Sequence, residues 1–209
     1  MFADNLLKNR LNIKPNLSCA TFVVLAAVIA AIGLKLAQWF LPAPEIPLLV
    51  QADGLVTSTD AQQAQATAGH AILMPEDLQG SDVYLFGVYT QAQESTPAGT
   101  VVVVLSKDDW RFAEVVEQPG VALDDALKAY GPLRQEDVAI AESISGKLID
   151  RALGYVKCVH GHDGIPGACQ LTKSLVFALS DTLITISADD SHATDGELIA
   201  IARSMISSQ

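Results

Sequence analysis

The residues best suited to chemistry stand together in one short segment, His160-Gly161-His162-Asp163. Two imidazoles at positions i and i+2 lie on the same side of an extended chain, and the adjacent carboxylate can join them on one ion. We therefore name His160, His162 and Asp163 as candidate metal ligands. A catalytic zinc site needs a third protein ligand, for which His70 and His192 are available, although no pattern places either nearby. The interpretation we favour is an exposed loop whose polar side chains are solvated.

Two cysteines flank this segment. Cys158 and Cys169 bracket the residues VHGHDGIPGA, a stretch rich in glycine and proline that holds no single shape unaided. In an oxidising compartment such a pair forms a disulfide, which would restrict the unfolded chain by roughly 3 kcal/mol in the chain-entropy model. We predict this disulfide, provided that this part of the chain is exported. The remaining cysteine, Cys19, lies in an apolar run and serves there as a small apolar residue.

Other catalytic patterns are weak. Ser143-Ile144-Ser145-Gly146 does not form the glycine elbow of a nucleophilic serine. The acidic pairs Asp108-Asp109, Asp124-Asp125 and Asp189-Asp190 each stand at a predicted turn or helix start, where aspartate is favoured for capping and turn bonds. We find no phosphate-cradling glycine loop and no dinucleotide fingerprint, and we expect no cofactor. We assign four aromatic residues to the core: Tyr84, Phe86, Trp110 and Phe112.

A long apolar run from Ser18 to Leu41 sets the organisation of the chain. At about 1.5 Å per residue, a helix of this length crosses a hydrocarbon core of roughly 30 Å. Its single charge is Lys35, which can extend outward along its own methylenes. Basic residues precede the run and acidic residues dominate after it, so the positive-inside bias predicts a cytoplasmic N-terminus and an exported C-terminal part. The preceding basic residues are Lys8, Arg10 and Lys14.

A retained anchor explains this run better than a cleaved signal peptide or a buried core helix. A cleaved signal has an apolar stretch of about 7–15 residues followed by a small-x-small cleavage site. This run is longer and ends in Gln38-Trp39-Phe40-Leu41-Pro42, where the aromatic pair suits a membrane interface. The predicted organisation is a cytoplasmic N-terminus (1–16), a transmembrane helix (17–41), a stalk or linker (42–57) and an extracytoplasmic domain (58–209).

The charge balance excludes two classes of partner. The chain has 24 acidic and 13 basic residues and a net charge of −11, and only Asp4 and Glu45 among the acidic residues precede Ile46. The exported part is therefore strongly acidic and repels phosphate backbones and anionic headgroups. We expect neither nucleic-acid binding nor peripheral lipid binding by this domain.

The pattern of apolar residues predicts an α+β domain, a mostly antiparallel sheet with helices packed on one face, preceded by the N-terminal transmembrane helix. A Thr194–Glu197 capping box opens the last helix, which carries its apolar residues on one stripe. Shorter helices are predicted at 60–68 and 123–130. Strands are predicted at 71–75, 82–91, 100–105, 110–118, 138–141, 154–159, 175–179 and 183–186.

Several of these segments together resemble a known family. In order they are ILMPEDL, VYLFGVYTQ, the hairpin VVVVLSKDDWRFAEVVEQPG, EDVAI, and SLVFALSDTLITISAD followed by ELIAIARSMI. The chain resembles the exported domain of unknown function that occurs in bacterial membrane proteins and as the outer part of some anti-sigma factors. The resemblance implies a fold and an envelope location, and it names no reaction. The chain departs from it in the Cys158–Cys169 insertion and in lacking an N-terminal zinc-binding helical domain that would hold a sigma factor.

We therefore expect a single-pass membrane protein that displays a non-catalytic binding or interaction domain outside the cytoplasm, in envelope signalling or upkeep. Its partner would be an envelope protein or a small ligand. Two alternatives stay open. One is a metal-dependent hydrolase that uses the loop with His160, His162 and Asp163, and the other is a lipid or peptide carrier that uses the space between the sheet and a helix.

Overall fold

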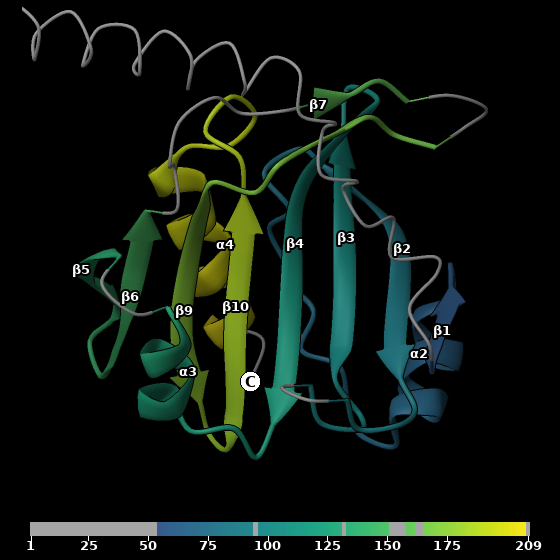
Figure 1. Cartoon of the computed structure of the whole chain (residues 1–209), viewed down its shortest axis with the longest axis horizontal. Helices are drawn as coiled ribbons and strands as arrows, with labels where there is room; N and C mark the ends of the chain where they lie inside the picture. Colours follow the sequence, from purple (N-terminus) through teal and green to yellow (C-terminus); the bar gives the residue numbers. More distant parts are fainter. Residues whose placement is uncertain (1–53, 94–95, 131–132, 151–157, 162–164, 208–209) are drawn as a thin grey trace, which may run out of the picture. The chain divides into compact units, whose positions relative to one another are not determined.

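The computed structural model describes residues 54–93, 96–130, 133–150, 158–161 and 165–207. These residues belong to one compact unit, Glu45–Gln209, with an α+β fold built on an eight-stranded sheet in the order β1-β2-β3-β4-β10-β9-β6-β5 (Figure 1). The sheet strands are β1 Leu55–Ser58, β2 Asp82–Tyr89, β3 Val101–Lys107, β4 Trp110–Pro119, β5 Arg134–Ala141, β6 Ile144–Asp150, β9 Lys173–Leu179 and β10 Thr182–Ala188. The other elements are the small ladder of β7 Cys158–Val159 and β8 Ala168–Cys169, and the helices α2 Ala61–Ala68, α3 Leu123–Ala129 and α4 Asp195–Ser207.

The sheet consists of two antiparallel blocks joined at its centre. The first block is the meander β1 to β4, and the second contains β5, β6, β9 and β10. The joint is the pairing of β4 with β10, which runs from Thr182 opposite Pro119 to Ser187 opposite Glu114. Because this pairing is antiparallel, the start of β4 and the end of β10 lie at the same end of the sheet (Figure 1). We call it the hairpin end, after the β3–β4 turn that it contains.

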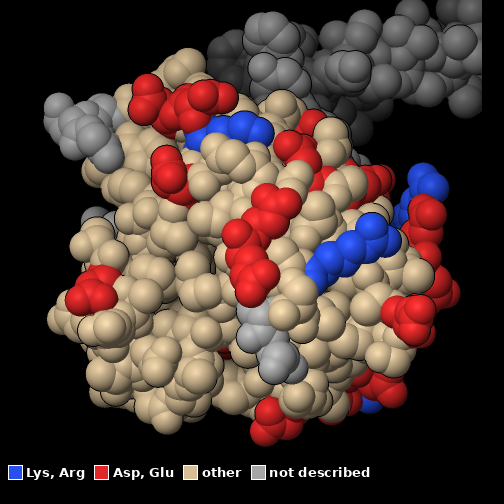
Figure 2. All heavy atoms as spheres, turned by 180° about the vertical axis from the view of Figure 1, so that it is seen from behind, with Lys and Arg blue, Asp and Glu red and all other residues tan. Residues whose placement is uncertain are grey.

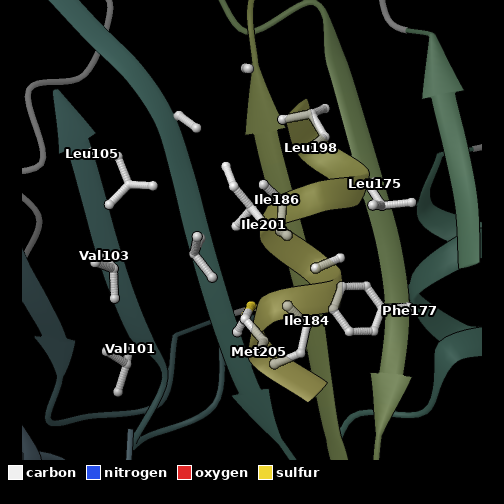
Figure 3. Packing of buried hydrophobic residues seen from close by; sticks show 14 of the residues in the cluster. Val101, Val103, Leu105, Leu175, Phe177, Ile184, Ile186, Leu198, Ile201 and Met205 are labelled. Atoms are coloured by element: carbon white, nitrogen blue, oxygen red, sulfur yellow. The ribbon is translucent and has the colours of Figure 1, made fainter. Parts of the chain in front are cut away.

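Helix α4 covers one face of the sheet as the apolar stripe predicts. Leu198, Ile201 and Met205 are fully buried in one cluster with residues of β9 and β10, among them Phe177 and Ile184 (Figure 3). The predicted capping box is confirmed and begins the helix. The backbone N–H of Glu197 donates to Thr194 Oγ1 at 3.3 Å, and that of Thr194 donates to a Glu197 carboxylate oxygen at 2.8 Å.

The expectation that all helices pack on one face is wrong for α3. Helix α2 contributes Ala64 to the same cluster as α4, whereas α3 covers the opposite face. There Leu123 and Leu127 lie against Val176 and Leu183, whose side chains alternate along the central strands with those under α4. The physical reason is that β9 and β10 are apolar on both faces, so each face needs its own cover.

The domain starts earlier than predicted. Strand β1 begins at Leu55, inside the segment 42–57 that the sequence indicates as a stalk, and pairs antiparallel with β2. The side chain of Leu55 lies over Gly87, where the absence of a Cβ leaves room for it. Four residues are too few to show a strand pattern, and only this partner strand makes them one.

The predicted strand at 71–75 is not a strand. The segment crosses the sheet as irregular chain, and the backbone N–H of Leu73 donates to both carboxylate oxygens of Glu117 at 3.1 Å. Glu117 lies within β4 and is fully buried. Burial raises the pKa of Glu117 to about 7, and the Leu73 hydrogen bond opposes the rise only in part. The carboxyl group thus takes the place of a neighbouring strand for this segment.

No helix in the described part of the chain is long and apolar enough to cross a membrane. The predicted cytoplasmic N-terminus (1–16) and transmembrane helix (17–41) lie outside the described residues.

The substitution Glu117→Gln is expected to remove a pH dependence of stability. Since the folded-state pKa is raised from 4.5 to about 7, the folded protein keeps a proton that the unfolded chain releases between these values. Wild-type stability therefore falls as pH rises through this window, by up to about 3 kcal/mol. Glutamine keeps an acceptor for Leu73 and does not titrate. Denaturant midpoints at pH 5, 6, 7 and 8 measure the effect.

The matched control is Glu136→Gln, an exposed glutamate on β5, which should leave the wild-type slope unchanged. A Glu117→Gln protein with the same slope as the wild type would show that the buried carboxyl is not its source.

Candidate functional site

Several described side chains that could take part in catalysis or ligand binding lie together at the hairpin end. Trp110 is the first residue of β4, and Asp189, Ser191 and His192 directly follow the last residue of β10. The antiparallel β4–β10 pairing brings these two segments together. The second cysteine, Cys169, lies in β8, just before β9 begins at the same end.

Trp110 is the centre of this group. The ring of His192 stacks on it, with centroids 4.9 Å apart and planes at 25°, and the ring of His160 approaches it edge-on at 5.3 Å. The chain at Gly167 runs beside the hairpin, accepting from Arg111 N–H at 2.6 Å and donating to the Asp109 carbonyl at 2.8 Å. A Cβ at Gly167 would lie 2.8 Å from the Trp110 ring, so only glycine fits this close approach.

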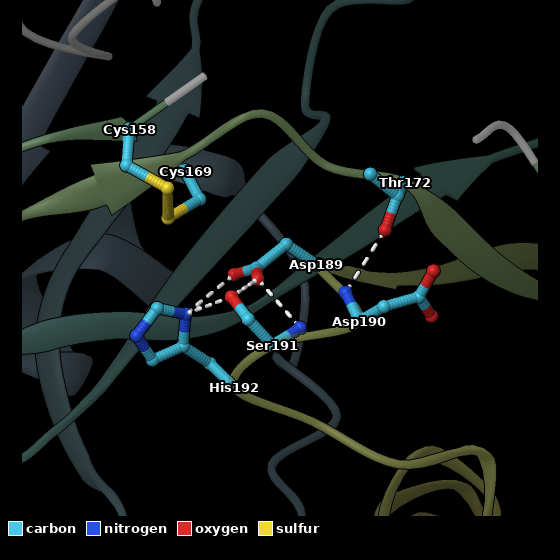
Figure 4. Close-up of a disulfide and its surroundings, with 7 residues drawn as sticks. All are labelled: Cys158, Cys169, Thr172, Asp189, Asp190, Ser191 and His192. Carbon is cyan, nitrogen blue, oxygen red and sulfur yellow. Dashed lines mark hydrogen bonds and ion pairs between the residues drawn. A yellow bond between two sulfur atoms is a disulfide. The ribbon is translucent and has the colours of Figure 1, made fainter. Parts of the chain in front are cut away.

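The predicted disulfide between Cys158 and Cys169 is confirmed, with an S–S distance of 2.03 Å. The two cysteines face one another directly in the β7–β8 ladder. Cys158 is exposed and Cys169 is buried. The bridge holds the chain that carries His160 against the sheet, beside the turn that follows β10 (Figure 4).

Asp189, Ser191 and His192 form a hydrogen-bonded group that differs from a catalytic triad. His192 Nδ1 lies 2.9 Å from Asp189 Oδ2 and 3.0 Å from Ser191 Oγ. In a triad, serine and acid engage opposite ring nitrogens, so that the imidazole can pass a proton between them. Here both use Nδ1, and Ser191 Oγ donates to Asp189 Oδ1 (Figure 4). The group orients His192 and does not activate Ser191.

The carboxylate of Asp189 is 1% exposed and is satisfied locally. Besides the Ser191 hydroxyl and His192, it accepts the Ser191 backbone N–H at 2.9 Å. The neighbouring Asp190 differs, because its carboxylate is half exposed and pairs with Lys173 at 2.5 Å. The expectation that this acidic pair serves a turn is confirmed for Asp189.

The sequence-predicted metal ligands are placed only in part. His160 is exposed and lies against Trp110, whereas His162 and Asp163 lie outside the described residues, so this metal site stays a prediction. Of the two possible third ligands, His192 contacts the same Trp110 ring. His70 does not join them, since it lies near Gly99, before β3 begins at the opposite end of the sheet.

An open groove of about 710 Å³ adjoins Trp110. Its walls come from the start of β2, the β3–β4 turn and the disulfide-bonded loop. Trp110 and Tyr84, which the sequence assigned to the core, are half-buried and line the groove, whereas Phe86 and Phe112 are core residues as predicted. Tyr84 lies near the start of β2 and Trp110 is the first residue of β4. Sequence periodicity carries no signal for how deeply a residue near a strand end is buried.

The groove is acidic. Asp82, Asp108 and Asp109 line it, and within the described residues none of the three forms an ion pair. Asp108 and Asp109 have φ angles of 52° and 62°, as in a type I′ hairpin turn, which places both at the tip. Their predicted turn role is therefore confirmed, and the turn also presents their charge. Viewed from behind, the molecule shows acidic groups outnumbering basic ones (Figure 2).

The two basic residues of the hairpin each pair with a glutamate, although Lys107 also lines the groove. Lys107 Nζ lies 3.6 Å from a Glu197 carboxylate oxygen, donates to the Gln79 carbonyl at 3.1 Å and lies 5.1 Å from the centre of the Phe112 ring. Arg111 pairs with Glu114 at 2.5 Å. Burial raises the pKa of Glu114, and the Arg111 guanidinium opposes that rise. Each cation thus has its own glutamate partner, and three aspartates face one lysine in the lining of the groove.

Two neighbouring aspartates provide a matched test of this site. Asp189→Ala should lower the free energy of unfolding by about 2–4 kcal/mol, because it leaves the Ser191 and His192 donors without their buried acceptor. Asp190→Ala removes only a half-exposed ion pair and should lower it by less than about 1 kcal/mol. Urea unfolding of both variants measures the difference, and equal losses would contradict the structural role of the Asp189 carboxylate.

Comparison of the chain with protein-family models, with curated proteins and with solved structures gave no match. The fold and the geometry of the hairpin end therefore carry the functional argument.

Proposed function

We propose that this chain is a single-pass, membrane-anchored extracytoplasmic binding domain of the bacterial envelope, and that the groove beside Trp110 binds a basic segment of a partner protein. The observation that supports the groove most directly is its composition. Asp82, Asp108 and Asp109 have no ion-pair partner among the described residues, and they surround the half-buried rings of Trp110 and Tyr84.

This combination suits lysine and arginine side chains. Carboxylates accept charge-assisted hydrogen bonds from both, and an aromatic face attracts a cation placed over it. Tryptophan and tyrosine are also enriched among the residues that contribute most of the binding energy at protein interfaces. They bury large areas with few rotatable bonds. An anionic ligand would meet the unpaired carboxylates and be repelled.

The groove is built on fixed supports. The β3–β4 turn is part of two paired strands, and Gly167 is hydrogen-bonded to the hairpin on both sides. The disulfide holds the loop that forms the third wall. Because the groove is already formed, the domain itself loses little conformational entropy when a flexible basic segment binds.

The membrane location rests on the apolar run Ser18–Leu41 and the basic residues before it. An anchored domain searches only the membrane surface, which raises its effective concentration toward neighbouring membrane proteins. The resemblance to exported domains of bacterial membrane proteins supports the same location, in envelope signalling or upkeep.

The two alternatives have less support. For a carrier, the space between the sheet and α4 would have to hold the ligand, but Leu198, Ile201 and Met205 fill it. For a metal-dependent hydrolase, only His160 of the three loop ligands lies among the described residues, and it belongs to no group of three metal-ligating side chains there. Metal analysis of the purified protein and of its His162→Ala variant tests the hydrolase.

Binding to the groove is measurable through Trp110. The chain has two tryptophans, so Trp39→Phe leaves Trp110 as the only one. In this background we expect saturable fluorescence changes when the full chain in detergent is titrated with hexalysine, and none with hexaglutamate. The change Asp108→Asn/Asp109→Asn should weaken hexalysine binding about tenfold, a loss of about 1.4 kcal/mol. Asparagine tolerates the positive φ angles of the turn, so the fold is kept.

The control is Asp124→Asn/Asp125→Asn, which removes the same charge from another acidic pair at the start of α3. It should leave hexalysine affinity within about twofold of the parent, since the two groups are distant and exposed charges are screened. Equal weakening by both double variants would indicate a general charge effect and would overturn the groove as the binding site.

The anchor has its own test. The full chain should stay in the membrane pellet after extraction with alkaline carbonate, because an apolar helix of this length partitions into lipid. A chain without residues 18–41 should be released to the supernatant. Release of the full chain under the same conditions would contradict a retained anchor.

A further inference from the structure

We propose that Cys169, Asp189 and His192 form a binding site for Zn²⁺ or a similar divalent transition-metal ion. This site becomes able to bind the ion when the Cys158–Cys169 disulfide is reduced. The proposal concerns residues beside the groove and does not depend on what the groove binds. It also differs from the loop site predicted from the sequence, because its ligands include none of His160, His162 and Asp163; the one overlap is His192, a candidate further ligand for that loop.

The three residues already converge. One ligand atom from each, the Cys169 sulfur, an Asp189 carboxylate oxygen and a His192 ring nitrogen, lies within 4.8 Å of the other two. A zinc ion with ligands at about 2.0–2.3 Å in tetrahedral geometry holds them roughly 3.5 Å apart. Side-chain adjustments of about an ångström therefore bring all three atoms onto one ion.

The donor set and its surroundings suit such an ion. Sulfur, imidazole nitrogen and carboxylate oxygen are the three ligand types that zinc takes in proteins, and three protein ligands leave an open position. Asp189 is almost fully buried. The backbone N–H and the hydroxyl of Ser191 both donate to Asp189 Oδ1, whereas Oδ2 lies 2.9 Å from His192 Nδ1, a contact that an ion bound between the two groups would replace. Such outer hydrogen bonds orient a carboxylate ligand.

The disulfide closes the site, because a metal ligand must be a thiolate and a bridged sulfur is not one. Cys158 is exposed and Cys169 is buried, so an external thiolate reaches Cys158. An external dithiol would attack the Cys158 sulfur, break the S–S bond and release Cys169 as a thiolate. The second thiol of the dithiol then closes its own disulfide and releases Cys158.

Electrons and protons balance in this exchange. The dithiol loses two electrons and two protons and becomes a disulfide, and the protein cystine gains the two electrons. One proton ends on the Cys158 thiol, and the other passes to solvent because the Cys169 thiolate binds the ion. His192 binds as a neutral imidazole. The ion then stabilises the reduced protein, since it binds that form alone.

The test uses Cys158→Ser, which leaves Cys169 free without any reductant. In full-length protein in detergent, with Cys19→Ser in every sample to remove the third thiol, Co²⁺ replaces zinc as an optical probe. We expect thiolate-to-cobalt charge-transfer absorption that saturates at one equivalent. The matched control, Cys169→Ser, also breaks the disulfide and leaves one free cysteine, but should give no such absorption.

The other two ligands are tested in the Cys158→Ser background. Asp189→Asn and His192→Ala should each weaken Co²⁺ binding at least tenfold. Charge-transfer absorption of equal strength in the Cys169→Ser protein, or unchanged affinity in both ligand variants, would overturn the site. Metal binding without thiolate absorption would do so as well and would direct attention to the loop with His160.

A second measurement covers the case in which these variants do not fold. Wild-type protein, with Cys19→Ser, is reduced with a phosphine and allowed to reoxidise in air with and without Zn²⁺. We expect Zn²⁺ to slow disulfide formation at least tenfold, and His192→Ala to abolish most of that slowing. The same reoxidation rate with and without Zn²⁺ would overturn the proposal.

Discussion

The pairing of β4 with β10 is the constraint on which the rest of the structure depends. It joins the meander β1–β4 to the block of β5, β6, β9 and β10 through six opposed residue pairs, from Thr182–Pro119 to Ser187–Glu114. It also places Ile186 opposite Val115 and Ile184 opposite Glu117, and both isoleucines belong to the core cluster that α4 covers. Because the pairing is antiparallel, the hairpin tip meets the turn that follows β10. The contact of Trp110 with His192, the groove and the proposed metal site all result from this meeting.

Among the described residues, the side chains of Glu117 and Asp189 are the most deeply buried carboxyl groups, and their surroundings differ. Glu117, near the end of β4, accepts one backbone N–H with its two oxygens, and burial raises its pKa to about 7. Asp189, directly after β10, accepts three hydrogen bonds from Ser191 and His192 within its own turn. A buried polar group with local donors is a rigid support, whereas one with few donors makes stability depend on pH. The site is therefore built on the better satisfied of the two groups.

The charged side chains of the β3–β4 hairpin also differ in whether they have an ion-pair partner. The two cations of the β3–β4 hairpin, Lys107 and Arg111, are paired with Glu197 and Glu114. The carboxylates at its tip have no such partner among the described residues, so the groove keeps an excess of negative charge beside aromatic rings. For the membrane-anchored domain that we propose, this arrangement would favour basic protein segments and disfavour anionic lipid headgroups.

The local features follow from the amino-acid order alone, because their hydrogen bonds and periodicity act over a few residues. These are the α4 stripe and its capping box, the Asp108-Asp109 turn, the cystine loop and the apolar run Ser18–Leu41, whose length and flanking charges need no partner to be recognised. Only the tertiary structure decided which strands meet, since backbone ladders carry little residue identity. It alone placed α3 on the second face, made strands of Leu55–Ser58 and Ile144–Asp150, and moved Tyr84 and Trp110 from the core to a groove. It also brought Cys169, Asp189 and His192 together, which no spacing along the chain reveals, because the strand ends that carry them meet only in the folded sheet.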